Sequence, residues 1–360
     1  MVPALGDPAL SPEGPGARHV LLNRRAATRP TITGVERWTA ELIPRLKALA
    51  PDLYEIAQPP SSVTGRALGQ GWEQVALPLR ALRTHAKLIF SPANLAPVAW
   101  PRNVVMVHDV AVVREPDAYS RAYTFWHRSV GIAAIRRALR VLTVSEFSRR
   151  ELLDLVGLQA DRVVVIRGGV DERFSPAADH APAAVAFGLD RPYVLTVSTN
   201  DRRKNLAALA EAVRRLGELG IDLVWAGESR SYFADAGVPV GIRALGYVPD
   251  AHLPGLYAGA RAFVLPSRYE GLGLTCLEAM ACGTPVVAAD RAALPETCGD
   301  AALLIDPDDP EAVAHAILVA ATDKSVREQL TGAGLRRAAE FTWERAARDS
   351  HAVISSLAST

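Results

Sequence analysis

Short apolar runs alternate with amphipathic helical segments along the first half of the chain. Near-continuous apolar runs are typical of strands in parallel sheets that helices cover on both faces. Such strands are expected at residues 19–23, 88–92, 103–109, 141–145 and 163–171, which read HVLLN, LIFSP, NVVMVHD, VLTVS and VVVIRGGVD. Helical periodicity follows at residues 35–49 and 132–141. This alternation predicts a first α/β domain.

The alternation restarts after residues 176–191, a stretch rich in Ala, Pro and Asp that we predict to be a hinge. A strand is expected at 193–197, a polar loop at 201–205 and a helix at 206–216. That helix carries its apolar residues on one face, namely Leu206, Leu209, Ala210, Val213 and Leu216. Further strands are expected at residues 223–227, 262–267, 285–290 and 301–306.

Two consecutive βα series predict an α/β fold of two Rossmann-like, doubly wound parallel-sheet domains that face a cleft. The first domain would span residues 1–175 and the second residues 192–341, with a last helix in residues 342–360. Ligands of such sheets bind beyond the carboxyl ends of the strands. Candidate chemistry is therefore sought in the loops that follow the strands.

Composition narrows the function. The chain has 360 residues, of which 22% are charged, and a formal net charge of +1, which argues against nucleic acid as a partner. The three cysteines, Cys276, Cys282 and Cys298, form no C-x-x-C pair and are expected to be free thiols. The sequence predicts neither a signal peptide nor a membrane-spanning helix, so we expect a cytoplasmic protein.

Residues 266–290, PSRYEGLGLTCLEAMACGTPVVAAD, carry most of the candidate chemistry. A strand ends there, Gly271 and Gly273 allow a tight turn, and a helix follows from Leu274. The free N–H groups of a helix N-terminus favour an anion such as a phosphate. Glu270 and Glu278 flank this turn, where their carboxylates can accept hydrogen bonds from the hydroxyls of a sugar and of a ribose.

This segment allows two other interpretations. A dinucleotide fingerprint would need a third glycine where Cys276 stands, and it would follow the first strand of its domain. Alternatively, Glu278 is a solvated helix residue with no function. The nearby glycines and Glu270 favour the nucleotide-sugar interpretation.

A basic loop follows the first strand of the second domain and reads STNDRRKN. Arg202, Arg203 and Lys204 precede a helix, where cations oppose the helix dipole unless an anion is bound. Arginine and lysine both bind phosphates well. The loop therefore predicts a diphosphate clamp, the alternative being ordinary solvated cations.

The E-x7-E spacing of Glu270 and Glu278 within YEGLGLTCLEAMACGTPVV resembles the signature of the retaining GT-B glycosyltransferases of family GT4. The resemblance extends over GYVPDAHLPGLYAGARAFVLPS before it and LPETCGDAALLIDPDDPEAV after it. It implies that Glu270 contacts the transferred sugar and Glu278 the ribose. Backbone N–H groups of Gly271, Leu272, Gly273 and Leu274 would hold the sugar and diphosphate. Leu272 and Thr275 replace the family's usual Phe and Pro.

The resemblance also assigns roles outside this segment. Lys204 and Arg203 would stabilise the leaving diphosphate, and Thr199 stands where many members carry an arginine. His108, at the end of a first-domain strand, would contact the donor sugar. Gly34, in a segment similar to T-G-I-G-R, would lie near the acceptor and the donor phosphate. No metal is expected, because no DxD-like acidic pair stands at a suitable place.

These roles imply transfer of a hexose, with retention at the anomeric carbon, from a nucleoside diphosphate sugar to a hydroxyl of a glycan or lipid-linked acceptor. The loop Arg203-Lys204-Asn205 resembles that of mannosyltransferases of bacterial surface polysaccharide synthesis. GDP-mannose is therefore the first choice of donor, and dTDP-rhamnose and UDP-sugars remain open. An epimerase or phosphorylase of the same fold is one alternative, and a non-catalytic sugar-binding protein is another.

Residues 119–150 combine aromatic residues with many arginines and few acids. The aromatic residues are Tyr119, Tyr123, Phe125 and Trp126. One interpretation is a helix with a solvated basic face and an aromatic core face. The other is peripheral contact with the anionic inner face of the cytoplasmic membrane, where a lipid-linked acceptor would be presented.

Overall fold

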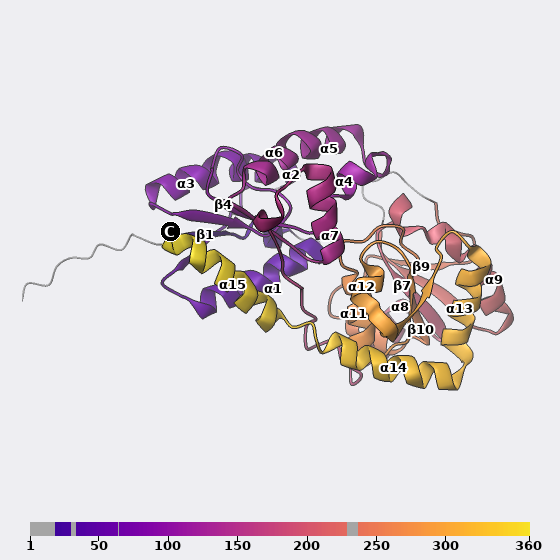
Figure 1. Ribbon diagram of the computed structural model, residues 1–360. Helices are drawn as coiled ribbons and strands as arrows, with labels where there is room; N and C mark the ends of the chain where they lie inside the picture. The colour runs from indigo at the N-terminus through magenta and orange to yellow at the C-terminus, as the bar shows by residue number, and fades with distance from the viewer. Residues whose placement is uncertain (1–18, 30–33, 64, 229–236) are drawn as a thin grey trace, which may run out of the picture.

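The computed structural model describes residues 19–29, 34–63, 65–228 and 237–360. Within them the chain forms two six-stranded sheets in which every paired strand is parallel. Each sheet is the centre of one half of the molecule (Figure 1). Residues 1–18 and 30–33, which include part of the segment similar to T-G-I-G-R, lie outside the described residues.

The first sheet has the order β2-β1-β3-β4-β5-β6. Its strands are β1 (Val20–Asn23), β2 (Tyr54–Ala57), β3 (Leu88–Ser91), β4 (Asn103–Val107), β5 (Arg140–Thr143) and β6 (Val163–Val165). The helices of this half are α1 (Gly34–Leu49), α2 (Arg66–Gly71), α3 (Leu77–Arg83), α4 (Ala111–Arg114), α5 (Arg121–Trp126), α6 (Ile132–Arg137) and α7 (Glu146–Glu151). Strands β1, β3 and β4 are fully buried, as their apolar runs predict.

The second sheet has the order β12-β11-β10-β7-β8-β9. Its strands are β7 (Tyr193–Val197), β8 (Asp222–Ala226), β9 (Arg243–Gly246), β10 (Ala262–Leu265), β11 (Val286–Ala289) and β12 (Ala302–Ile305). The helices after the hinge are α8 (Ala181–Phe187), α9 (Ala210–Glu218), α10 (Leu253–Ala258), α11 (Leu274–Ala281), α12 (Leu294–Cys298), α13 (Pro310–Thr322), α14 (Lys324–Ala338) and α15 (Trp343–Ser359). The predicted α/β fold with two parallel sheets is confirmed.

Several local predictions were wrong. The helix expected over 132–141 ends at Arg137, because Arg140–Thr143 pairs with β4 as strand β5. The helix expected from residue 206 opens with a 3-10 turn, Leu206–Leu209, before α9. The hinge predicted at 176–191 is not among these, although that stretch contains helix α8, which packs on α10. Strands β2 and β9 were missed, because β2 is only partly buried and β9 contains no fully buried residue.

The chain passes between the halves twice, and the two passages lie side by side. The N–H of Val170 donates to the carbonyl of Phe341 at 3.0 Å. A Cβ on Gly169 would lie 2.2 Å from the backbone nitrogen of Trp343, so only glycine allows this approach. Helix α15 then packs along α1 of the first half (Figure 1). The ring of Trp343 at the start of α15 meets the ring of Trp38 edge-on at 5.1 Å.

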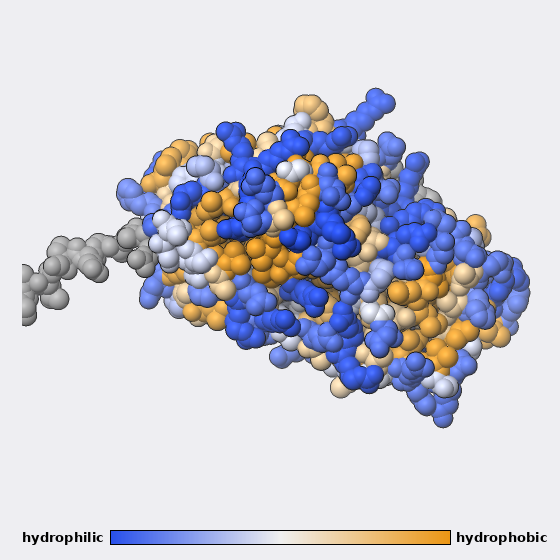
Figure 2. Space-filling view, viewed as in Figure 1, coloured by the Kyte–Doolittle hydropathy of each residue, from blue (hydrophilic) through white to orange (hydrophobic). Residues whose placement is uncertain are grey.

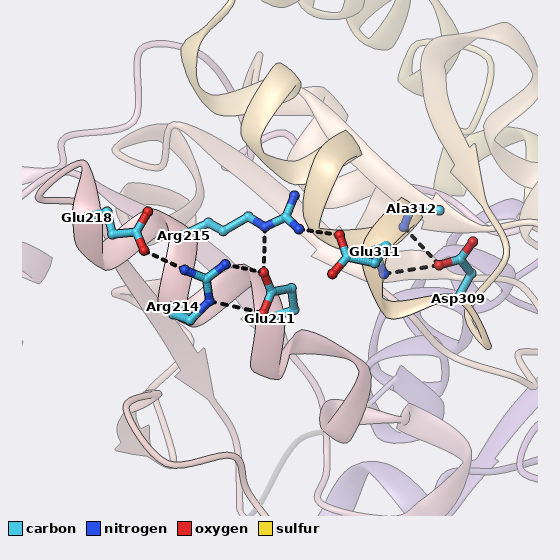
Figure 3. A network of polar contacts seen from close by, with 7 residues as sticks. All are labelled: Glu211, Arg214, Arg215, Glu218, Asp309, Glu311 and Ala312. Atoms are coloured by element: carbon cyan, nitrogen blue, oxygen red, sulfur yellow. Dashed lines mark hydrogen bonds and ion pairs between the residues drawn. The ribbon is translucent and has the colours of Figure 1, made fainter.

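One ion pair, Arg215 with Glu311, joins α9 to α13 (Figure 3). Arg215 contacts both Glu211 of its own helix and Glu311 of α13. Asp309 caps α13 by accepting hydrogen bonds from the N–H groups of Glu311 and Ala312. Ion pairs near the surface contribute little stability each, so we assign this network no large share of the stability of the fold.

Candidate active site

A cavity of about 280 Å³ opens between the two halves, at the carboxyl ends of β7 and β8. Most of its lining comes from the second half, including Val197, Thr199, Lys204, Ala226, Glu270 and Glu278. Gly34 and Arg37 of α1 line it from the first half. The site therefore lies where a parallel sheet is expected to bind its ligand.

The basic loop folds into a single 3-10 turn, Arg202–Lys204, and its three cationic side chains lie in different surroundings. Asp201 caps the turn, and Asn205 ends it in the left-handed region at φ 54°. Lys204 lines the cavity, and its Nζ lies 2.7 Å from Oε1 of Glu270. Arg202 is exposed. Lys204 and Glu270 thus form a partly buried ion pair in the cavity lining.

Arg203 does not take the place that the sequence predicts for a phosphate clamp. Its side chain is buried, with Nε 3.0 Å from Oδ1 and Nη2 3.2 Å from Oδ2 of the fully buried Asp201. Its guanidinium also lies over the ring of Tyr119 in the first half, at 5.2 Å. Arg203 is absent from the described lining of the cavity. This bidentate pairing assigns it to holding the loop.

Helix α11 begins at the cavity wall. Gly273 precedes it with φ 90°, and a Cβ there would meet Cδ2 of Leu294 at 2.5 Å, so glycine is required. Gly273, Leu274 and Thr275 all line the cavity. Among the described residues, no side chain caps this N-terminus. Its first N–H groups are therefore suited to bind an anion, as the sequence predicts.

Glu278 lies one turn further into α11 and is only 4% exposed, which excludes the interpretation of a solvated helix residue. Its Oε2 accepts a hydrogen bond from the hydroxyl of Tyr257 at 2.9 Å, and Oε1 faces Nε of Arg37 at 3.6 Å. Burial raises the pKa of the Glu278 carboxyl above its ordinary value, although Arg37 and the hydrogen bond from Tyr257 act to lower it. Glu278 and Glu270 both line the cavity, with the start of α11 between them in the chain.

Gly271 joins this segment to the first half. Its carbonyl accepts hydrogen bonds from Oγ of Ser145 at 2.6 Å and Oγ of Ser148 at 3.2 Å. A Cβ on Gly271 would lie 2.1 Å from the carbonyl oxygen of His108, so the backbones approach as only glycine allows. Gly271 and the buried Leu272 are outside the described cavity lining, which begins again at Gly273.

His108 is likewise placed beside the site and not in its lining. Its imidazole is buried edge-on against Trp38, at 5.0 Å between ring centroids. Nε2 lies 2.8 Å from the carbonyl oxygen of Pro92, which can only accept, so Nε2 carries the proton. Burial lowers the pKa of this imidazole. The prediction that His108 contacts the donor sugar gains no support from this position, because the side chain is fixed by Pro92 and Trp38.

Arg37, Tyr257 and Asp250, which lie together around Glu278, were not expected from the sequence. The sequence offers one signal for Arg37, because a cation in the first turn of α1 opposes the helix dipole unless an anion lies nearby. Its carboxylate partners lie more than 200 residues away, so the sequence could not identify them.

The described part of the chain contains no cluster of three or more His, Cys, Asp and Glu residues that could hold a metal ion. It also contains no helix whose length and apolar content would suit it to cross a bilayer. Cys276, Cys282 and Cys298 are buried free thiols.

Solved structures with the same arrangement of two parallel sheets are glycosyltransferases of the GT-B fold. Sucrose-phosphate synthase from Thermosynechococcus elongatus superposes with a TM-score of 0.74 at 20% identity, covering 93% of this chain and 98% of that one. Anabaena HepE in complex with UDP-glucose gives 0.73 at 18% identity, covering 94% and 100%. At these identities the likeness establishes the fold.

Sequence comparison establishes the family. The model of Glycosyltransferase Family 4 matches residues 32–174, and that of Glycosyl transferases group 1 matches residues 191–323. The O-antigen chain mannosyltransferase B of Escherichia coli is 36% identical over 278 residues, which cover 73% of each protein. The chain belongs to the group 1 family of glycosyltransferases and is an enzyme that transfers a sugar.

Proposed function

We propose that the protein transfers mannose from GDP-mannose, with retention at the anomeric carbon, to a hydroxyl of a glycan or lipid-linked acceptor in surface polysaccharide synthesis. The observation that carries the proposal is the arrangement of the cavity. The Lys204–Glu270 pair, Glu278 and the first residues of α11 all line the same cavity. The name of the Escherichia coli relative supports mannose as the sugar.

The geometry gives each group a chemical task in this reaction. The sugar hydroxyls would donate hydrogen bonds to Glu270, and the ribose hydroxyls to Glu278. The diphosphate would lie at the first N–H groups of α11 with Lys204 beside it, where negative charge grows as the bond to the sugar breaks. The described lining contains four carboxylates, Glu228, Asp250, Glu270 and Glu278, and the last three are already paired with Arg37 or Lys204. Attack of the acceptor from the face of the leaving diphosphate, with that phosphate as base, is therefore our working mechanism.

Calorimetric titration of the protein with GDP, UDP and dTDP tests the donor. GDP is expected to bind with a Kd within the range of about 1 µM to 1 mM that is usual for enzyme substrates, and more tightly than the other two. Incubation with GDP-mannose and an acceptor glycan, followed by NMR of the product, then tests mannosyl transfer and the anomeric configuration. Tighter binding of UDP or dTDP would refute GDP-mannose, and an epimerised free nucleotide sugar would indicate the alternative activity.

The surface around α5 and α6 combines basic and aromatic side chains. A cavity of about 550 Å³ is lined by Tyr119, Arg121, Phe125 and Arg128, among others, and Phe125 is 73% exposed. The sequence has no acidic residue between positions 118 and 145. Figure 2 shows apolar and hydrophilic side chains side by side over these helices. We propose that this surface contacts the anionic membrane that presents a lipid-linked acceptor.

Vesicle sedimentation tests the membrane contact. The protein is expected to bind vesicles containing phosphatidylglycerol, and binding should fall as salt is raised, because exposed charges are screened. Arg121→Gln with Arg128→Gln should weaken binding by about tenfold or more, since each arginine near an anionic surface contributes about 1 kcal/mol. Arg336→Gln with Arg348→Gln, two exposed arginines outside residues 119–150, is the matched control. Equal binding to neutral vesicles would refute the electrostatic contact.

A further inference from the structure

A largely buried group of charged side chains around Glu278 joins the two halves of the molecule in the cavity lining. Arg37 comes from α1 of the first half and is 7% exposed. Its Nη2 lies 2.8 Å from Oδ1 of Asp250, and its Nε lies 3.6 Å from Oε1 of Glu278. All three residues line the cavity. Arg37 thus reaches across the cleft to two carboxylates of the opposite half.

Asp250 is held from two sides. Its second oxygen, Oδ2, lies 3.0 Å from Nη2 of Arg173, which follows β6. Both guanidinium groups lie over the ring of Phe174, at 5.5 Å for Arg37 and 5.2 Å for Arg173. Arg173 is not part of the described cavity lining. The two arginines therefore share Asp250, but only Arg37 also faces Glu278 and the ligand cavity.

Some polar atoms of Glu278 and Arg37 lack a hydrogen-bond partner within the described part of the chain. Oε2 of Glu278 is engaged by Tyr257, whereas Oε1 and Nε of Arg37 are 3.6 Å apart, beyond a good hydrogen bond. Nη1 of Arg37 is buried and has no hydrogen-bond acceptor among the described residues. Buried polar groups without partners are rare and costly in folded proteins. A ligand group that both donates and accepts would satisfy these atoms.

A hydroxyl group has this dual character, because it donates one hydrogen bond and accepts others. We propose that Arg37 completes the ribose subsite from the first half of the molecule by donating a hydrogen bond to the ribose hydroxyl that donates to Glu278. The inference rests on the proposed function, which places the ribose at Glu278. It adds that the nucleotide is recognised by both halves, so a ligand held by the second half alone lacks one of its donors.

Titrations with GDP, 2′-deoxy-GDP and 3′-deoxy-GDP test this subsite. The wild-type protein is expected to bind GDP at least about tenfold more tightly than the weaker deoxy analogue, because a hydrogen bond to a charged group is lost. Arg37→Met should weaken GDP binding by about tenfold or more. It should also lower the ratio of the weaker analogue's Kd to that of GDP by at least about threefold, and a smaller ratio should remain because Glu278 still accepts a hydrogen bond from the hydroxyl. Arg173→Met is the matched control, since it removes the other arginine on Asp250 and should leave the ratio of the two Kd values unchanged.

Arg37→Lys is a second test in case the methionine variant does not fold. It keeps a cation near Asp250 but lacks the additional nitrogens of the guanidinium group. It should unfold near the wild-type temperature and still show a reduced ratio. An unchanged ratio in the Arg37 variants, or an equal loss in Arg173→Met, would overturn the inference. Wild-type protein that binds GDP without discriminating the deoxy analogues would overturn it while leaving the proposed function intact. Wild-type protein that binds no nucleotide would overturn both.

Discussion

Replacing Lys204 by alanine is expected to lower kcat by about 10²–10³-fold, the usual cost of removing one group that stabilises charge in a transition state. Lys204 is the cation of the basic turn that lines the cavity, and among the described residues its ammonium pairs with Glu270 at 2.7 Å. Departure of the sugar leaves negative charge on the diphosphate, so the ammonium matters more in the transition state than in the bound donor. KM for the donor should therefore change less than kcat.

The neighbouring arginine supplies the control for this prediction. Arg202 belongs to the same 3-10 turn but is exposed, so Arg202→Ala should leave kcat within about threefold of the wild-type value. Initial rates over a range of donor concentrations measure both parameters, and thermal unfolding checks that Lys204→Ala remains folded. A fall in kcat of less than about threefold for Lys204→Ala, or an equal fall for Arg202→Ala, would refute the role of Lys204.

The elements that the sequence predicts best are those whose pattern is local. Strands such as β4 and β10 are fully buried, so their apolar runs are unambiguous. Strand β9, which reads RALG, lies at the edge of its sheet and contains no fully buried residue. Its position depends on pairing with β8, which is a contact between distant parts of the chain that periodicity does not encode.

The same distinction holds in the candidate site. The turn before α11 could be predicted, because glycine, helix propensity and the spacing of Glu270 and Glu278 are features of one segment. The direction of each side chain in the basic turn could not be predicted, because it depends on the orientation of the Asp201 carboxylate. Arg37 was missed for the stronger reason that both of its partners, Asp250 and Glu278, belong to the other half of the molecule.

Arg203 should therefore behave as a stability residue, although it stands beside Lys204. Arg203→Met is expected to lower the free energy of unfolding by about 3–5 kcal/mol, because breaking a buried ion pair leaves an uncompensated charge. Asp201, the charge that would remain, is fully buried and receives two hydrogen bonds from the Arg203 guanidinium. Burial alone would lower the pKa of that guanidinium, but nearby Tyr119 and Asp201 raise it, so the cation is favoured in the folded protein.

Urea unfolding followed by circular dichroism measures this effect, and a second substitution identifies its cause. Asp201→Asn removes the charge that Arg203→Met leaves behind, so the double variant should be more stable than the sum of the two single losses predicts. Lys204→Ala should be close to the wild-type stability in the same assay, because its ion pair is only partly buried. If instead Arg203→Met unfolded like the wild type and lost catalytic rate, the guanidinium would have to leave Asp201 for the substrate. That result would support the phosphate clamp expected from the sequence. A substitution that lowers the catalytic rate and leaves the stability unchanged removes a group that acts on the donor and not on its own loop.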